Sequence, residues 1–254
     1  MEFFDSHSHY NDEKYNLDRN EIINSVYNEG IKRLVCAGYN VKQSEFALNL
    51  TKEFHFMYAT CGISPNDIED FVDNSLEKIE ELAKEDKIVA IGEIGLDYYW
   101  NKENKELQKE LFIKQIEIAN RLDKPIVIHT RDAWQDTIEI LNSYPVNKKG
   151  IFHCCPLNQE LIKEALKLGF YISFSGNITF KNAKSEGCVS LVPMDRILIE
   201  TDCPYLSPEP YRGKRNDSRN VKLVAQKIAE IKGISIEEVA KQTYKNANEI
   251  FNLE

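Results

Sequence analysis

Long hydrophobic runs are missing from this chain of 254 residues. No apolar stretch approaches the roughly 20 residues that a membrane-spanning helix needs, so a membrane-embedded protein is excluded. The opening segment, Met1-Glu-Phe-Phe-Asp5, is too short and too acidic to be a secretion signal. We therefore expect a cytoplasmic protein that has no membrane partner.

Paired-cysteine motifs are missing as well, because none of the six cysteines forms a CxxC pair. Most of them lie in or beside predicted strands, where a free cysteine acts as a small buried hydrophobe. Without a secretion signal we expect all of them to be reduced and structural. They are Cys36, Cys61, Cys154, Cys155, Cys188 and Cys203.

The chain also lacks an excess of positive charge. It has 32 Lys and Arg against 41 Asp and Glu, a formal net charge of -9. The mean field of such a protein repels phosphates, which excludes a general polyanion binder. A role with nucleic acid would have to depend on a local basic patch or on bound metal. The composition is otherwise that of a soluble globular protein that buries a substantial core.

Eight short apolar runs bounded by glycine, proline or charged residues are typical of buried parallel strands. They are Phe3–Asp5, Arg33–Ala37, Met57–Cys61, Val89–Gly92, Ile126–His129, Gly150–His153, Tyr171–Phe174 and Ile197–Glu200. Segments with the 3.6-residue apolar period of helices lie between most of them. These are Asn20–Asn28, Lys42–Glu53, Leu76–Glu85, Lys105–Leu122, Trp134–Leu141, Leu157–Leu168 and, more weakly, Lys181–Leu191. Two further helices are expected at Val221–Lys232 and Ile236–Asn248, the second with a capping box of Ser235 and Glu238.

This regular alternation requires parallel pairing with right-handed crossovers. Eight strand–helix units in a chain of this length predict one (β/α)8 TIM barrel, residues 1–254, with extra C-terminal helices. An open doubly wound sheet is the alternative, and it would place a glycine-rich phosphate loop after the first strand. Asp5-Ser-His-Ser-His9 stands there instead, which favours the barrel.

Four of the five histidines and two acids lie at the C-terminal ends of the predicted strands. They are His7, His9, Glu93, His129, His153 and Asp202. Each one alone fits an ordinary role, such as a helix cap, a salt bridge or a core histidine. Because the C-terminal ends of barrel strands meet at one mouth, the six together predict a metal site there.

Two divalent cations are favoured over one, because six N and O ligands exceed the need of a single catalytic cation. Glu93 is the expected bridge, since a carboxylate can join two metals. His7, His9 and Asp202 should share one cation with Glu93, whereas His129 and His153 should share the other. Ligands of this kind suit Mg, Mn or Zn. Asp202 is also expected to orient the attacking water and accept its proton.

Candidate substrate contacts follow two of the strands. Arg131 comes two residues after His129 and points the same way. The long segment Cys203–Asn220 contains Arg212, Lys214 and Arg215, which could bind phosphate or only face solvent. Three aromatic residues after Glu93 could stack on bases or simply pack at the barrel rim: Tyr98, Tyr99 and Trp100.

Five motifs in order carry a family resemblance that runs nearly end to end. They are Phe4-Asp-Ser-His-Ser-His9, Gly92-Glu-Ile-Gly-Leu-Asp97, Pro125-Ile-Val-Ile-His129-Thr-Arg-Asp132, Phe152-His-Cys154 and Glu200-Thr-Asp-Cys-Pro-Tyr205-Leu with the following Arg212-Gly-Lys-Arg-Asn216. The chain resembles the TatD-like metal-dependent deoxyribonucleases, which belong to the amidohydrolase-type hydrolases. The resemblance implies a TIM barrel, a divalent-metal site with the six ligands above, and 3′→5′ hydrolysis of single-stranded DNA.

Three positions depart from that family pattern. Gly62-Ile-Ser64-Pro65-Asn66 stands where the family usually has a second histidine pair, so Ser64 replaces a histidine expected near the scissile phosphate. Cys155-Pro-Leu157 and Asp217-Ser218 are the other two departures. All six predicted metal ligands are retained, so the departures concern how phosphate is held.

The sequence therefore favours a divalent-metal-dependent deoxyribonuclease that cleaves single-stranded DNA ends with a metal-activated water. Asp202 and Glu93 are the expected catalytic residues, and the protein is expected to be a monomer. The expected substrate contacts are Arg131, Arg212, Lys214, Arg215 and Ser64. A small-molecule amidohydrolase or phosphoesterase with the same metals is the alternative, although such enzymes often use a carbamylated lysine and no lysine ends a strand here. A non-enzymatic binding protein, the third possibility, would need no metal.

Overall fold

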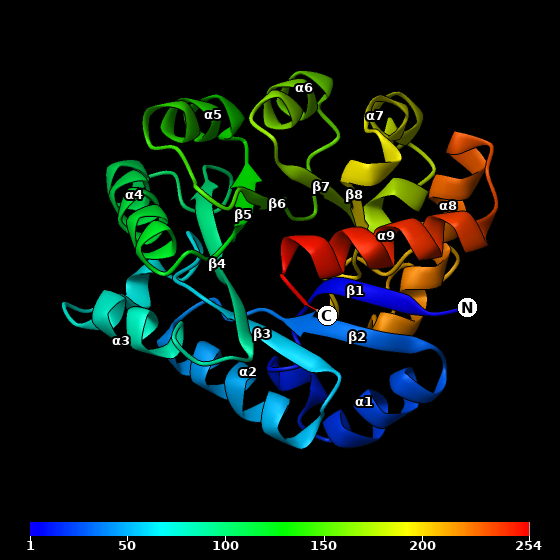
Figure 1. The fold of residues 1–254 in the computed structure, drawn as a ribbon, viewed down its shortest axis with the longest axis horizontal. Coiled ribbons are helices and arrows are strands. Elements are labelled where there is room, and N and C mark those ends of the chain that lie inside the picture. The colour runs from blue at the N-terminus through cyan, green and yellow to red at the C-terminus, as the bar shows by residue number, and fades with distance from the viewer. Residues whose placement is uncertain (254) are drawn as a thin grey trace.

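The computed structural model describes residues 1–253, which form an eight-stranded parallel sheet in the order β1 to β8. The sheet curls into a nearly closed barrel with helices around its outside (Figure 1), which confirms the predicted TIM barrel. The strands are β1 (Phe3–Ser8), β2 (Ile31–Cys36), β3 (Met57–Cys61), β4 (Ile88–Asp97), β5 (Ile126–Arg131), β6 (Gly150–Phe152), β7 (Tyr171–Phe174) and β8 (Ile197–Ile199).

Helices alternate with the strands as their apolar periodicity predicts. They are α1 (Arg19–Asn28), α2 (Val41–Glu53), α3 (Ser75–Leu82), α4 (Lys105–Arg121), α5 (Trp134–Ser143), α6 (Gln159–Lys167), α7 (Ser185–Leu191), α8 (Val221–Lys232) and α9 (Ile236–Ile250). The capping box at the start of α9 is confirmed, with the Ser235 side chain bonded to the Glu238 amide and the Glu238 carboxylate returning to Ser235. None of the helices among residues 1–253 is long and apolar enough to cross a membrane.

The barrel is closed at its N-terminal end by α9. One hydrophobic cluster joins residues near the starts of the strands, such as Phe4 and Val127, to Ala247 and Phe251. The Phe4 and Phe251 rings stack with centroids 5.9 Å apart, and Figure 1 shows α9 lying across β1. The opposite, C-terminal end is thereby left as the place for a site, as in other TIM barrels.

The first and last strands meet through hydrogen bonds at that C-terminal end. The Asp202 amide donates to the His7 carbonyl at 3.0 Å, and the His9 amide donates to the Cys203 carbonyl at 2.7 Å. Buried Asp5 strengthens the junction, because its carboxylate accepts from the Thr201 amide at 2.9 Å and from the Thr201 hydroxyl at 2.6 Å. Barrel closure therefore also sets the distance from His7 and His9, at the end of β1, to Asp202.

The predicted strand ends differ from the observed ones in an informative way. The apolar run Val89–Gly92 predicts a strand that stops before Glu93, whereas β4 continues to Asp97. The ladder with β5 provides the reason, because it pairs Gly95 with His129 and Asp97 with Arg131. Conversely, β6 and β8 end one residue earlier than predicted, before His153 and Glu200, and α3 ends at Leu82. In β4, hydrogen-bond pairing rather than the apolar run alone therefore sets where the strand ends.

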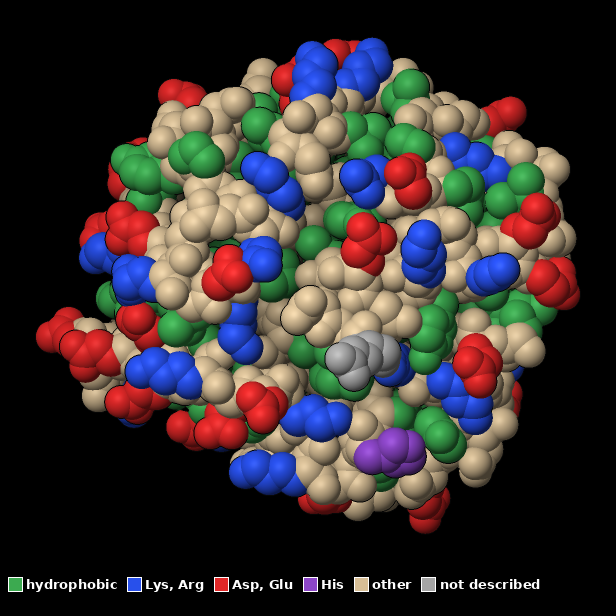
Figure 2. All heavy atoms as spheres, in the orientation of Figure 1, with side chains coloured by type: hydrophobic (Ala, Val, Ile, Leu, Met, Phe, Trp, Pro, Cys, Tyr) green, Lys and Arg blue, Asp and Glu red, His purple; other side chains and the backbone are tan. Residues whose placement is uncertain are grey.

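Charges of both signs are mixed on the face that Figures 1 and 2 show. Lys and Arg side chains alternate with Asp and Glu over this face, with hydrophobic atoms between them (Figure 2). Among the described side chains, no single-sign patch dominates this face (Figure 2). The six cysteines are free and all but Cys154 are buried, as expected for structural thiols.

Gly95 provides a test of how closely β4 and β5 pack beside the predicted metal ligands. Its φ is +135°, and an added Cβ would overlap the His129 carbonyl oxygen. We expect Gly95→Ala to lower the free energy of unfolding by more than about 2 kcal/mol, measured by urea denaturation. Gly213→Ala is the matched control, because Gly213 also has a positive φ but nothing within 4 Å of the added atom. If both variants lost only about 1 kcal/mol of unfolding free energy, β4 and β5 would have to move apart enough to accommodate the added Cβ.

Candidate metal centre

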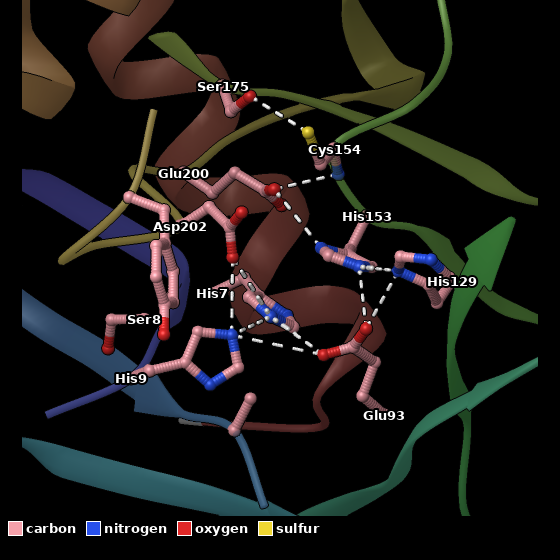
Figure 3. Close-up of polar contacts among 12 residues, drawn as sticks. His7, Ser8, His9, Glu93, His129, His153, Cys154, Ser175, Glu200 and Asp202 are labelled. Carbon is pink, nitrogen blue, oxygen red and sulfur yellow. Dashed lines mark hydrogen bonds and ion pairs between the residues drawn. The ribbon is translucent and has the colours of Figure 1, made fainter. Parts of the chain in front are cut away.

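The six side chains predicted as metal ligands converge on one point inside the barrel mouth (Figure 3). His7, Glu93 and His129 lie within β1, β4 and β5. His9 and His153 directly follow β1 and β6, and Asp202 comes three residues after the end of β8. Glu93 lies at the centre of the group, because its carboxylate faces all four imidazoles. The structure thus brings together every residue that the sequence assigned to the metal site.

The first ligand group consists of His7, His9 and Asp202 around Oε2 of Glu93. Oε2 lies 3.6 Å from His7 Nε2 and 3.9 Å from His9 Nε2. The two Nε2 atoms are 3.1 Å apart. Asp202 Oδ1 lies 3.2 Å from His9 Nε2. Both rings of the HxH pair therefore point to one side, as the two-residue spacing predicts.

The second ligand group consists of His129 and His153 around the other oxygen of Glu93. Oε1 lies 2.8 Å from His129 Nδ1 and 3.2 Å from His153 Nε2. These two nitrogens are 3.3 Å apart. Glu93 thus directs one oxygen to each ligand group, which is the arrangement expected of a bridging carboxylate.

The spacing of these atoms fits divalent cations. Bonds of about 2.0–2.1 Å in tetrahedral geometry place ligand atoms about 3.3 Å apart. Three trios of described residues have ligand atoms within 4.8 Å of one another: His7–His9–Glu93, Glu93–His129–His153 and His7–His153–Glu200. The first two share Glu93 and correspond to the two ligand groups above. The facing imidazole nitrogens, 3.1 Å apart in one group and 3.3 Å in the other, have the separation expected of two ligands on one cation. The donor set of imidazoles and carboxylates suits Zn or Mn, or Mg with additional water.

The electrostatics of the cluster favour anionic carboxylates. Burial alone would raise the pKa of Glu93, but the imidazoles of His153, His129 and His7 outweigh it and hold that pKa well below its usual range. The pKa of Asp202 is likewise lowered, because His9 offsets the effect of burial. Both carboxylates are therefore ionised at neutral pH. Burial lowers the pKa of His7, whereas the facing carboxylates outweigh burial and raise the pKa of His9, His129 and His153. A bound cation would compete with protons for the nitrogens of these last three imidazoles.

Two further carboxylates contact the histidines from behind, and the sequence analysis assigned a role to neither. Asp97 Oδ2 lies 2.9 Å from His129 Nε2, and Glu200 Oε1 lies 3.4 Å from His153 Nδ1. In both rings the contacted nitrogen is the one that does not face Glu93. Such partners orient a metal-binding imidazole and fix its tautomer. Asp97 ends β4 and Glu200 directly follows β8, and both belong to the family motifs given above. This position at a strand end is the sequence signal that could have identified them.

A cavity of about 800 Å³ opens over the cluster. Arg131 and Ser64 line it, as the sequence analysis expects of substrate contacts, and so do Tyr39, Trp100 and Tyr205. Ser64 is buried, and its hydroxyl oxygen accepts a hydrogen bond from the Asn66 amide at 3.3 Å. The cavity has a size typical of sites that hold a small organic molecule or part of a polymer, about 300–1,000 Å³.

The basic loop residues lie elsewhere. Arg212, Lys214 and Arg215 are not among the residues that line this cavity. Arg215 forms an ion pair with Asp18 at 2.5 Å and donates to the Lys14 carbonyl. Arg212 lies over the Phe180 ring and Lys214 near the Tyr211 ring. Their role in substrate binding stays a prediction, and any such contact would have to form outside the cavity.

Comparison with known protein families gives a match over residues 4–252 to the family described as TatD related DNase. The chain belongs to the TatD-related DNase family. It is 43% identical over 252 residues to the uncharacterized metal-dependent hydrolase YabD of Bacillus subtilis, covering 98% of this chain and 99% of that protein. It is 37% identical over 259 residues to the uncharacterized metal-dependent hydrolase YcfH of Escherichia coli, covering 100% and 97% respectively.

Solved structures agree with this assignment at the level of the fold. The TatD homologue YJJV of Escherichia coli superimposes with a TM-score of 0.94 at 24% identity, covering 99% of this chain and 98% of its own. A TatD-family hydrolase of Entamoeba histolytica gives a TM-score of 0.89 at 22% identity, with 98% of each chain covered. This TatD-related protein is accordingly a metal-dependent hydrolase, and the residues converging on Glu93 are those that could hold its metal.

Glu200 tests whether the carboxylates behind the histidines act through the metal centre. We expect Glu200→Gln to weaken divalent-cation binding by about 10- to 100-fold, because His153 loses the partner that orients it. Titration calorimetry with Zn or Mn measures this. Glu160→Gln, the same change at an exposed position of α6, should leave cation affinity unaltered. Equal affinities in the two variants would remove Glu200 from the metal centre.

Proposed function

We propose that this protein is a deoxyribonuclease that uses two divalent cations to hydrolyse phosphodiester bonds at single-stranded DNA ends. The observation that carries the proposal is Glu93, whose two carboxylate oxygens face two separate ligand groups at the floor of an open cavity. The family description supports DNA as the substrate. When bound, a pair of cations at such a site activates water and stabilises charge on the attacking and leaving oxygens.

The side chains around Glu93 divide the remaining tasks. His7, His9 and Asp202 would hold one cation, His129 and His153 the other, and Glu93 both. Asp202 is less buried than Glu93, with 15% of its side chain exposed against 7%, and it lines the cavity. We therefore assign to Asp202 the orientation of the attacking water and the acceptance of its proton.

The charge of the cavity explains why cations are needed for an anionic substrate. Five carboxylates line it and only one guanidinium, that of Arg131. The acids are Asp12, Asp67, Glu93, Asp97 and Asp202. His9, His129 and His153 also line the cavity and offset part of this negative charge. Divalent cations would reverse it, so we propose that DNA enters only the metal-loaded protein.

The recessed position of the cluster favours chain ends over duplex interiors. A paired phosphate could not reach the floor of the cavity without local fraying, whereas a single-stranded end can enter it. Arg131 would hold a phosphate at the rim, since its side chain is exposed and lines the cavity. Arg212, Lys214 and Arg215 would then contact the strand beyond the cavity and add salt-dependent affinity.

A small-molecule hydrolase is the second candidate, and Ser64 is the observation that favours it. This buried hydroxyl lines the cavity where the family usually places a histidine near the phosphate. A serine can donate a hydrogen bond there but cannot supply positive charge. Ester, amide or lactone hydrolysis by the same cations would need no such charge.

The number of cations can be tested at Glu93. We expect the wild type to bind two divalent cations per chain and Glu93→Gln to retain no more than one tightly, because the amide has only one oxygen to offer. Metal analysis after dialysis against limiting Mn or Zn gives the stoichiometry. A wild type that saturates at one cation, with Glu93→Gln identical to it, would contradict the bridged pair.

The substrate can be tested with end-labelled single-stranded and duplex DNA in Mg, Mn or Zn, with EDTA as the blank. We expect shortening of single strands from the 3′ end, little cleavage of duplex interiors, and none in EDTA. Asp202→Asn should reduce the rate by about 10²-fold or more, because the amide cannot accept the proton.

Asp195→Asn is the matched control, since Asp195 is exposed and outside the cavity. Its rate should equal that of the wild type. Intact DNA under all conditions, together with metal-dependent hydrolysis of a small ester, amide or lactone, would replace the nuclease by the second candidate.

A further inference from the structure

Two aromatic side chains are exposed on the segment between β4 and α4. Trp100 is 70% and Tyr99 46% exposed, and Trp100 lines the cavity above the metal centre. An indole with this much exposure contributes little to the hydrophobic stability of the fold, because little of its surface is removed from water. Its position at the rim of the cavity therefore points to a contact with a ligand.

The segment that carries these aromatic residues is held firmly. Asp97 Oδ1 accepts hydrogen bonds from the amides of Tyr99 and Trp100, each at 2.9 Å. The buried Gln108 side chain of α4 bonds the Asp97 amide at 2.8 Å and the Asn101 carbonyl at 2.7 Å. A rigid aromatic side chain loses little conformational entropy when a ligand stacks on it.

The same carboxylate connects this segment to the metal centre. While Oδ1 of Asp97 holds the Tyr99 and Trp100 amides, its Oδ2 lies 2.9 Å from Nε2 of His129. One side chain thus sets both the orientation of a metal ligand and the place of the aromatic pair. The distance between the exposed indole and the reacting centre is therefore fixed by few, short contacts.

Arg131 completes the surface beside the aromatic pair. Its guanidinium carbon lies 3.9 Å from the centroid of the Tyr99 ring and 5.4 Å from that of Trp100. The Tyr98 amide donates to the Arg131 carbonyl at 2.9 Å, which joins the segment to the end of β5. A guanidinium stacked in this way keeps the N–H groups at its edge available for a phosphate.

We propose that Trp100, Tyr99 and Arg131 form a nucleoside-phosphate subsite of single-stranded nucleic acid. A base next to the scissile bond stacks on the indole, and its phosphate binds the guanidinium. Because every base has an aromatic face, the subsite accepts all four bases and sets affinity rather than sequence preference. This inference rests on the proposed nuclease function, since it names the part of that substrate which the rim binds.

The test compares two single-stranded oligonucleotides of equal length, one normal and one whose last three residues at the cleaved end are abasic. With the wild type, we expect a higher KM for the abasic strand and a similar kcat for both. Trp100→Ala should raise the KM for the normal strand by about 5-fold or more and leave the KM for the abasic strand unaltered, because only the normal strand stacks. Trp100→Phe should recover most of the lost affinity.

Tyr144→Ala is the control for loss of an exposed aromatic residue, because Tyr144 is 42% exposed and does not line this cavity. Its KM for both strands should match that of the wild type. Metal content, measured for every variant, should equal that of the wild type. A Trp100→Ala protein with wild-type KM on the normal strand would overturn the subsite while the nuclease function stands. A wild type that cleaves neither strand would instead refute the proposed function itself.

Discussion

The buried carboxylate of Glu93 is the constraint on which the site depends. An ionised carboxylate removed from water is strongly destabilising unless opposite charges and hydrogen-bond donors surround it. The imidazoles of His153, His129 and His7 supply that environment here and hold the pKa of Glu93 well below its usual range. They come from three strands other than β4, so the barrel has to close before the charge is satisfied. Formation of the candidate metal centre therefore depends on closure of the barrel.

Barrel closure and the metal centre share a set of polar contacts at the C-terminal end. The hydrogen bonds that join β1 to the segment after β8 run through His7, His9 and Asp202 themselves. The Asp5 carboxylate supports the same junction by accepting a hydrogen bond from the Thr201 amide. The N-terminal end is closed by apolar packing of α9 against the strand starts. Apolar packing thus closes one end, and the candidate metal centre lies at the other end, as is usual in TIM barrels.

Carboxylates behind the histidines extend this arrangement outward. Glu200 contacts His153, and Asp97 contacts His129 while holding the rim segment that carries Trp100. The orientation of His129 and the position of the rim segment are therefore coupled through one side chain, that of Asp97. The cavity lining is rich in carboxylates. In the proposed nuclease function, the cations would therefore serve both to bind DNA and to hydrolyse it.

The sequence by itself determined the barrel and the six candidate ligands, Glu93 and the five side chains around it. Apolar runs, helical periodicity and strand-end histidines are local patterns, and the fold only brings them together. The family membership was visible in the same motifs. Tertiary structure alone decided which oxygen of Glu93 faces which ligand group, since that depends on how strands far apart in sequence are staggered. It also decided the roles of Asp97 and Glu200 and the extension of β4, which follow from pairing with β5 rather than from hydrophobicity. It also decided which of the candidate substrate-binding arginines faces the cavity. Arg131 lines the cavity, whereas Arg215 forms an ion pair with Asp18.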